Sequence, residues 1–172
     1  MRLLLDRDAR IHTEIAALNA ILLSAPLCVS TIPIDKQEIF YYHKTTCRGL
    51  YEKEITKAKK MGYAETLFTN QEGHITEGTF TTVFLLKKGI LYTPALACGL
   101  LPGVLRAHLI RKGLAKEAVL TMDDVVGCEK VFIGNSVRGL MPAAVNAPVK
   151  KTHPKETIAI FIAQNSFSGK IK

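Results

Sequence analysis

The sequence predicts an α/β domain built on a mixed sheet, and three features of the chain favour this class. Segments typical of strands and of amphipathic helices alternate along most of the 172 residues. Two strand pairs follow one another without an intervening helix, as in a β-meander. Hydrophobic residues make up 48% of the chain, which is enough for one domain of residues 1–172 to bury a full core.

The first half of the chain begins with β-like runs and continues into a helix. Residues 2–6, 28–34 and 39–42 are apolar, β-branched or aromatic runs and are predicted strands. Residues 46–61 carry apolar side chains at helical spacing and end before Gly62, a residue suited to a helix C-terminus. Lys44 is therefore expected at a strand-to-helix junction.

The second half supplies the meander and further helices. Residues 65–69 and 75–76 flank a turn at 70–74, and residues 81–87 and 90–93 flank Lys88-Gly89, so both pairs are predicted hairpins. Residues 102–112 form a predicted helix with Leu101, Leu105 and Leu109 on one face and Gly113 as its stop. A strand at 131–133 and an amphipathic helix at 154–165 complete the prediction.

Composition limits the partners that the chain is expected to have. The net charge is +8, but Lys and Arg are scattered and no nucleic-acid-binding motif occurs, so a small anionic ligand is expected and a nucleic acid is not. The apolar run 15–27 is too short to span a bilayer, and Asp6 interrupts any signal-peptide core, so no membrane partner and a cytoplasmic location are expected. Four separated cysteines lack metal-ligand spacing and are expected to be reduced, mostly buried thiols.

Lys44 and Glu77 are the candidate catalytic groups. Lys44 ends an aromatic and apolar run, where desolvation can leave a neutral, nucleophilic amine of the kind that Schiff-base chemistry needs. The carboxylate of Glu77 is suited to holding a ring nitrogen. The alternative for each residue is a solvated surface charge, because ionised side chains mostly stay in water.

Five segments, in this order, resemble the large domain of the class IV, fold-type IV pyridoxal-phosphate enzymes. They are His43-Lys44-Thr45-Thr46, Thr76-Glu77-Gly78, and the stretches GLLPGVLR (99–106), LTMDD (120–124) and IGNSVRG (133–139). The HKTT and NSVRG wording most resembles 4-amino-4-deoxychorismate lyase, which releases pyruvate and the folate precursor 4-aminobenzoate. The resemblance implies a fold-type IV domain, with a mixed, partly barrel-like sheet and flanking helices, and pyridoxal 5'-phosphate as the cofactor.

The same resemblance implies roles for both candidate groups. Lys44 would form the internal aldimine with pyridoxal phosphate and later act as general base. Glu77 would lie beside the pyridine nitrogen and keep the ring an effective electron sink. Lyase and transaminase share these steps, so Lys44 and Glu77 alone do not separate the two reactions.

Phosphate and substrate contacts are implied at three other places. The backbone amides of Val104 and Leu105, at a helix start, and Asn135 with Ser136, after the strand at 131–133, would bind the phosphate. Arg138 would meet a substrate carboxylate. The alternatives are an ordinary helix cap, an ordinary turn and a rim arginine.

Neighbouring residues are given structural interpretations. His43 is expected to pack on the face opposite Lys44, because side chains alternate along a strand. Arg48 is interpreted as a solvated charge and Tyr51 as a core aromatic. Thr82 stands where members of the family usually have Asn, five residues after the acid, which removes an amide able to hold the neighbouring loop.

Three further expectations concern the whole protein. Relatives carry a small N-terminal domain with an arginine that grips the phosphate, and that domain is expected to be absent here. Besides the lyase, the resemblance leaves open a branched-chain or D-amino-acid aminotransferase, or a non-catalytic large domain that only folds, dimerises or binds cofactor weakly. The expected partners are a small anionic substrate with an amino group and a second copy of the chain.

Overall fold

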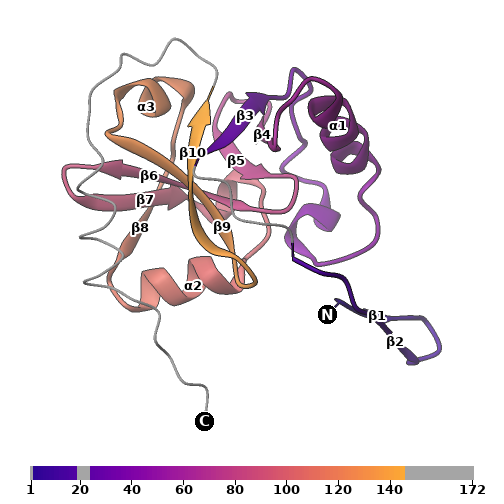
Figure 1. The fold of residues 1–172 in the computed structure, drawn as a ribbon. Coiled ribbons are helices and arrows are strands. Elements are labelled where there is room, and N and C mark those ends of the chain that lie inside the picture. The colour runs from indigo at the N-terminus through magenta and orange to yellow at the C-terminus, as the bar shows by residue number, and fades with distance from the viewer. Residues whose placement is uncertain (1, 19–23, 146–172) are drawn as a thin grey trace.

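The computed structural model describes residues 2–18 and 24–145, whose main feature is one eight-stranded sheet. Its strands are β3 (Ala25–Val29), β4 (Glu65–Thr69), β5 (Ile75–Gly78), β6 (Thr82–Lys87), β7 (Ile90–Pro94), β8 (Ala115–Ala118), β9 (Lys130–Asn135) and β10 (Gly139–Val145). They lie in the order β5-β4-β3-β10-β9-β6-β7-β8, mix parallel and antiparallel pairs, and curl into a half-barrel (Figure 1). The predicted mixed, partly barrel-like α/β fold is confirmed.

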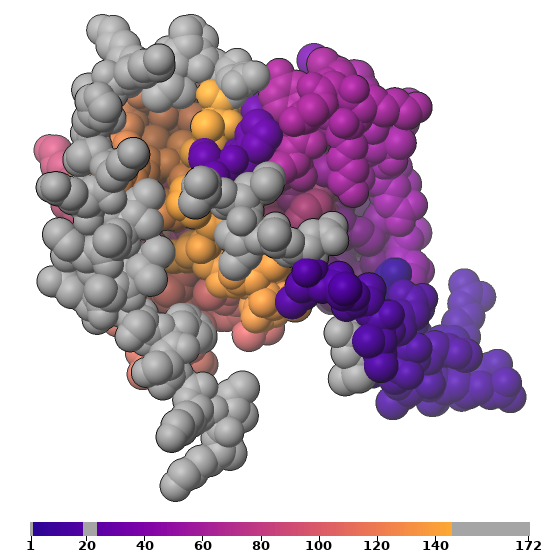
Figure 2. Space-filling view, in the orientation of Figure 1, coloured from indigo at the N-terminus to yellow at the C-terminus, as the bar shows by residue number. Residues whose placement is uncertain are grey.

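Short helices and one hairpin complete the described part of the chain. The helices are α1 (Gly49–Lys60), α2 (Val104–Arg111), α3 (Met122–Gly127) and the 3-10 turns η1 (Ile39–Tyr42) and η2 (Leu96–Cys98). The hairpin of β1 (Arg2–Leu5) and β2 (Ile11–Glu14) projects from the body (Figure 2). Its apolar side chains Leu3, Leu5 and Ile11 are exposed.

The core follows the two-residue alternation of the central strands. Val83 and Leu85 of β6 point into a cluster beneath α3, which includes Leu120 and Val125. The residues between and after them, beginning with Phe84, point into a second cluster with the buried face of α2. A third, smaller cluster of Ile34, Tyr51 and Phe68 lies under α1. The helices therefore pack where the strands present apolar side chains.

β10 joins two halves of the sheet. It runs parallel to β3, which continues to β4 and β5, and antiparallel to β9, which continues to β6, β7 and β8. The first half carries Glu77, and the second half carries the start of α2 and the turn after β9. The two ends of the candidate site therefore come from different halves.

Most predicted elements are confirmed, and two predicted strands are wrong. β4, the two hairpins, α1, α2 and β9 match within a few residues, and β1 matches the strand at 2–6. Residues 39–42 form η1, because no strand pairs with them and the Glu38 side chain caps the turn by accepting from Phe40 N at 3.3 Å. The strand predicted at 28–34 lies earlier, at 25–29, leaving only an isolated bridge from Ile34 to Asn70. The helix predicted at 154–165 falls outside the described residues.

The exposure of the cysteines differs from the prediction. All four thiols are free, but only Cys98 is buried, Cys28 and Cys128 are half-buried, and Cys47 is exposed. The expectation of mostly buried thiols is therefore wrong.

No helix within residues 2–18 and 24–145 is long and apolar enough to cross a membrane. The same residues hold no cluster of three or more His, Cys, Asp or Glu able to bind a metal ion.

Candidate functional site

A pocket of about 450 Å³ lies between the 40–48 segment, the 77–82 segment and the start of α2. Six of the residues that line it are those predicted to hold a cofactor: Lys44, Glu77, Val104, Leu105, Asn135 and Ser136. Residues from four separate stretches of sequence thus meet around one hollow. Arg138 is not among the lining residues, so its contact with substrate stays a prediction.

Glu77 is a buried carboxyl with two hydrogen-bond donors. It belongs to β5, all four residues of which are buried, and its own exposure is 7%. The Tyr51 hydroxyl donates to Oε1 at 2.8 Å, and the Leu101 backbone N–H donates to Oε2 at 3.2 Å. Burial raises the pKa of Glu77 to about 7, although both hydrogen bonds favour the charged form. The carboxyl is thus poised to hold or release a proton near neutral pH.

Tyr51 and Arg48 form the wall beside Glu77, and both line the pocket. Tyr51 is buried against Phe68, with ring centroids 4.8 Å apart, so the prediction of a core aromatic is confirmed in packing but missed its bond to Glu77. The prediction that Arg48 is a solvated charge is wrong. Its guanidinium carbon lies 5.0 Å from the Tyr51 ring centroid, and its Nη2 donates to the Thr79 carbonyl oxygen. Their spacing of four and seven residues after Lys44, at the N-cap and in the first turn of α1, was the available signal.

Lys44 lies in the irregular segment between η1 and α1, not at the end of a strand. Desolvation lowers the pKa of Lys44, and the positive charge of Arg48 lowers it further, while Glu77 acts in the opposite direction. The amine is therefore easier to deprotonate than an ordinary lysine, but Lys44 is exposed, so its role as a desolvated nucleophile stays a prediction. His43 also lines the pocket, so its predicted position on the opposite face is wrong, because strand alternation does not apply to this segment.

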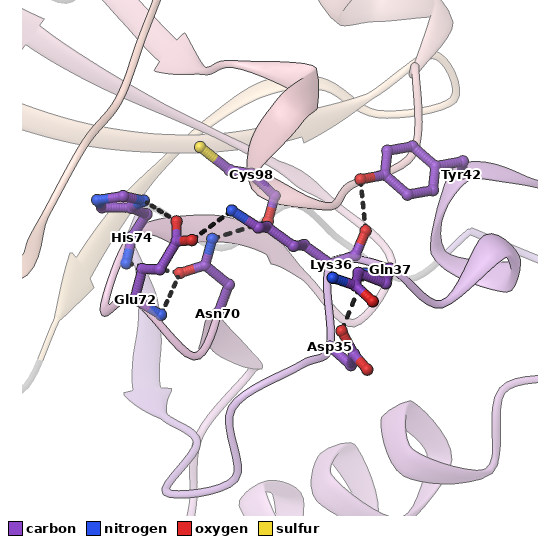
Figure 3. Close-up of polar contacts among 8 residues, drawn as sticks. All are labelled: Asp35, Lys36, Gln37, Tyr42, Asn70, Glu72, His74 and Cys98. Atoms are coloured by element: carbon purple, nitrogen blue, oxygen red, sulfur yellow. Dashed lines mark hydrogen bonds and ion pairs between the residues drawn. The ribbon is translucent and has the colours of Figure 1, made fainter.

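Upstream of Lys44, a polar network anchors the chain (Figure 3). Lys36 forms an ion pair with Glu72 in the turn between β4 and β5, and the Tyr42 hydroxyl donates to the Lys36 carbonyl oxygen at 2.7 Å. Gly99 has a φ of +93°, and a Cβ there would stand 2.9 Å from the Lys36 Cα. Gly99 lies two residues before Leu101, whose backbone N–H donates to Glu77. The close approach of Gly99 to Lys36 therefore also positions this donor.

The opposite end of the pocket is built from a helix start and a turn. Gly103 precedes the first residue of α2, so the N–H groups of Val104 and Leu105 belong to the first helical turn, which lacks intrahelical acceptors. The Asn135 side chain accepts from the N–H groups of Val137 and Arg138 at 3.0 Å, and it donates to the Phe80 carbonyl oxygen at 3.2 Å. Asn135 thus shapes its turn with its side chain and leaves the exposed Ser136 beside the pocket.

Together these groups fit a phosphorylated pyridine cofactor. The cavity volume falls in the range usual for small-molecule sites. An amine with a lowered pKa, a buried carboxyl and a helix N-terminus line the same cavity. Each matches one feature of such a ligand, namely its aldehyde, its ring nitrogen and its phosphate.

Comparison with known proteins places the chain in a family. Residues 5–145 match the family described as amino-transferase class IV. The chain belongs to this family. Its members use pyridoxal phosphate.

The relatives of this class IV chain include both transaminases and lyases. The branched-chain-amino-acid aminotransferase of Escherichia coli K12 is 31% identical over 96 residues, covering 55% of this chain and 30% of that protein. The aminodeoxychorismate lyase of Saccharomyces cerevisiae is 27% identical over 135 residues, covering 68% of this chain and 36% of that protein. The crystal structure of a provisionally assigned amino-acid aminotransferase from Mesorhizobium loti superposes with a TM-score of 0.79 at 37% identity, covering 83% of this chain and 70% of that one.

The chain spans about a third of the length of these two curated relatives. Their identities are low and of similar size, so the resemblance to the lyase is no stronger than the resemblance to the transaminase.

Proposed function

We propose that this chain binds pyridoxal 5'-phosphate covalently through Lys44 and uses it to act on the amino group of a small anionic substrate. The observation that carries the proposal is the convergence of Lys44, Glu77 and the start of α2 on one pocket. Lys44 and Arg48 give the pocket positive charge, which favours an anionic ligand. When bound, the cofactor supplies an electron sink for the carbanion formed at the substrate carbon.

The chain's own residues supply the proton chemistry. Nζ of Lys44, with its lowered pKa, accepts the proton from the carbon that carries the substrate amino group. The anionic form of Glu77 holds the proton on the ring nitrogen, and Tyr51 and the Leu101 N–H keep the carboxylate oriented. The first-turn N–H groups of α2, with Ser136, bind the phosphate dianion.

We propose aminodeoxychorismate lyase chemistry as the specific reaction. Phe40, Tyr41, Tyr42 and Phe80 line the pocket, and such aromatic side chains suit a substrate with an unsaturated ring. The products, pyruvate and 4-aminobenzoate, together contain all the atoms of aminodeoxychorismate, so the reaction needs no water and no oxidant.

Transamination is the second candidate, because a branched-chain-amino-acid aminotransferase is also a relative. Assays of the protein incubated with pyridoxal phosphate separate the two. The lyase releases 4-aminobenzoate from aminodeoxychorismate, whereas a transaminase transfers the amino group of a branched-chain amino acid to 2-oxoglutarate. Absence of both activities alongside clear cofactor binding would favour the non-catalytic, cofactor-binding module.

Covalent attachment of the cofactor provides the first test. The protein is incubated with pyridoxal phosphate, reduced with borohydride and digested, and mass spectrometry locates the phosphopyridoxyl group. We expect it on Lys44 and expect Lys44→Ala to lose it. Lys36→Ala is the matched control, because Lys36 is a nearby lysine whose pKa is raised by its ion pair with Glu72. Label at Lys36, or equal label in the Lys44→Ala protein, would contradict the proposal.

We also propose that the chain forms a homodimer, as members of the family it resembles usually do. Exposed apolar side chains on β1 and β2, including Leu3 and Ile11, support association because they would lose contact with water in a dimer. Light scattering coupled to size-exclusion chromatography measures the mass directly. A single monomeric species at micromolar concentration would refute this part of the proposal.

A further inference from the structure

Glu65, the first residue of β4, is a buried carboxyl to which the proposed chemistry gives no role. Its exposure is 1%. Oε1 accepts from the backbone N–H groups of Thr66 and Thr79, each at 2.9 Å, and from the Thr79 hydroxyl. Oε2 accepts from the Thr81 hydroxyl at 2.9 Å and from the Phe80 N–H at 3.3 Å. Four of these five donors belong to the short segment 79–81.

Only a carboxylate satisfies this set of donors. Three of the five are backbone N–H groups, which cannot accept a hydrogen bond, and an ionised carboxylate offers acceptor sites on both oxygens. A neutral amide of the same shape would place its NH₂ group where one of the two oxygens now stands, facing the donors that bind that oxygen. Burial raises the pKa of Glu65, and the hydrogen bonds from Thr79, Thr66 and Thr81 oppose that rise.

Backbone packing brings Glu65 directly against the residue that follows Glu77. A Cβ added at Gly78 would stand 2.5 Å from the Thr81 Oγ1 and 2.9 Å from the Glu65 Cδ. A side chain at position 78 would therefore displace the carboxylate or the Thr81 hydroxyl. The Gly in the Thr76-Glu77-Gly78 motif leaves room for Glu65.

Segment 79–81 is held on its other side by residues of the pocket. The Thr79 carbonyl oxygen accepts from Arg48, and the Phe80 carbonyl oxygen accepts from the Asn135 side chain at 3.2 Å. The N–H groups of Thr79 and Phe80 thus point to Glu65, while the carbonyl groups of the same two residues reach Arg48, near Glu77, and Asn135, in the predicted phosphate turn. The segment connects the two ends of the pocket.

We propose that Glu65 is a positioning residue: its buried carboxylate binds segment 79–81 and thereby fixes Glu77 and the Asn135 turn relative to each other. The predicted effect on ligand binding rests on the proposed cofactor function. The effect on the segment itself does not.

The test compares Glu65→Gln with a matched buried control, Glu54→Gln. Glu54 lies on α1, is 5% exposed, accepts from the Ser30 hydroxyl at 3.2 Å and does not line the pocket. Hydrogen exchange of the cofactor-free protein measures how firmly segment 79–81 is held, and fluorescence titration measures the Kd for pyridoxal phosphate. We expect Glu65→Gln to speed exchange at 79–81 and to weaken binding about ten- to a hundredfold, since it removes hydrogen bonds to a charged group. Glu54→Gln should change neither.

The outcomes separate positioning from general stability and from cofactor binding. If both variants weaken binding equally, or neither does, the positioning role is overturned. If wild-type protein binds no pyridoxal phosphate, the proposed function fails, and unchanged exchange at 79–81 in Glu65→Gln would independently overturn this inference. If Glu65→Gln does not fold, Thr81→Val and Thr81→Ser replace it, because only the serine keeps the hydroxyl that donates to Glu65. Equal affinity of those two variants would overturn the role as well.

Discussion

Removing the Tyr51 hydroxyl should raise the pKa of Glu77 and change how much of the carboxyl is charged at neutral pH. In Tyr51→Phe the ring keeps its contacts with Tyr41 and Phe68, and only the 2.8 Å hydrogen bond to Oε1 is lost. A hydrogen bond to an ionised group contributes about 1.5–3 kcal/mol, and one pKa unit corresponds to about 1.4 kcal/mol. The pKa, about 7 in the wild type, should therefore rise by about one to two units.

Carbon-13 NMR of glutamate-labelled protein measures this pKa, with the Glu77 resonance assigned from Glu77→Gln. At pH 7 the ionised fraction should fall from about a half to about a tenth or less. Tyr92→Phe, which alters a half-buried tyrosine of β7 outside the pocket, is the control and should leave the midpoint unchanged. An unshifted midpoint in Tyr51→Phe would refute the conclusion that Tyr51 stabilises the charged carboxylate.

Because the folded-state pKa of Glu77 is raised from 4.5 to about 7, the native state binds the extra proton, so the free energy of unfolding should fall as pH rises through this window. The loss is about 3 kcal/mol at most. Urea denaturation at a series of pH values measures the free energy of unfolding, which should depend less steeply on pH in Glu77→Gln. Gly99→Ala should destabilise the fold more than Gly89→Ala, since both have positive φ but only position 99 also meets Lys36; equal melting temperatures would contradict this. Arg48→Met should raise the pKa of Lys44, measured by pH-dependent reductive methylation, because it removes a neighbouring positive charge.

The elements that could be predicted from the sequence are those with a clear local pattern of turn residues and apolar runs. The turns at 70–74 and at Lys88-Gly89 carry glycines with positive φ between alternating apolar runs, so both hairpins were accessible from sequence. Residues 39–42 have the composition of a strand, but whether they pair depends on a neighbouring strand that sequence does not reveal. The strands β8 and β10 were not predicted. β8 contains the charged pair Lys116-Glu117 and β10 contains Pro142, and these residue types are depleted in strands.

For the candidate site, the resemblance located six of the residues that line the pocket, but it did not reveal what holds them. Lys44, Glu77 and Asn135 were named because they stand in recognisable motifs. Glu65 and Arg48 act through backbone groups of segment 79–81, which have no signature in the sequence. Their roles depend on a tertiary approach of β4 and α1 to the same short loop.

The central place of β10 has a consequence for how the protein is made. Residues 139–145 are the last of the described chain to leave the ribosome, yet their pairing with β3 spans more than a hundred positions and closes the gap between the two half-sheets. Contacts of such long range form slowly, and until they form β3 and β9 each present an open edge. Nascent chains that stop short of this strand should therefore aggregate readily and need chaperone protection.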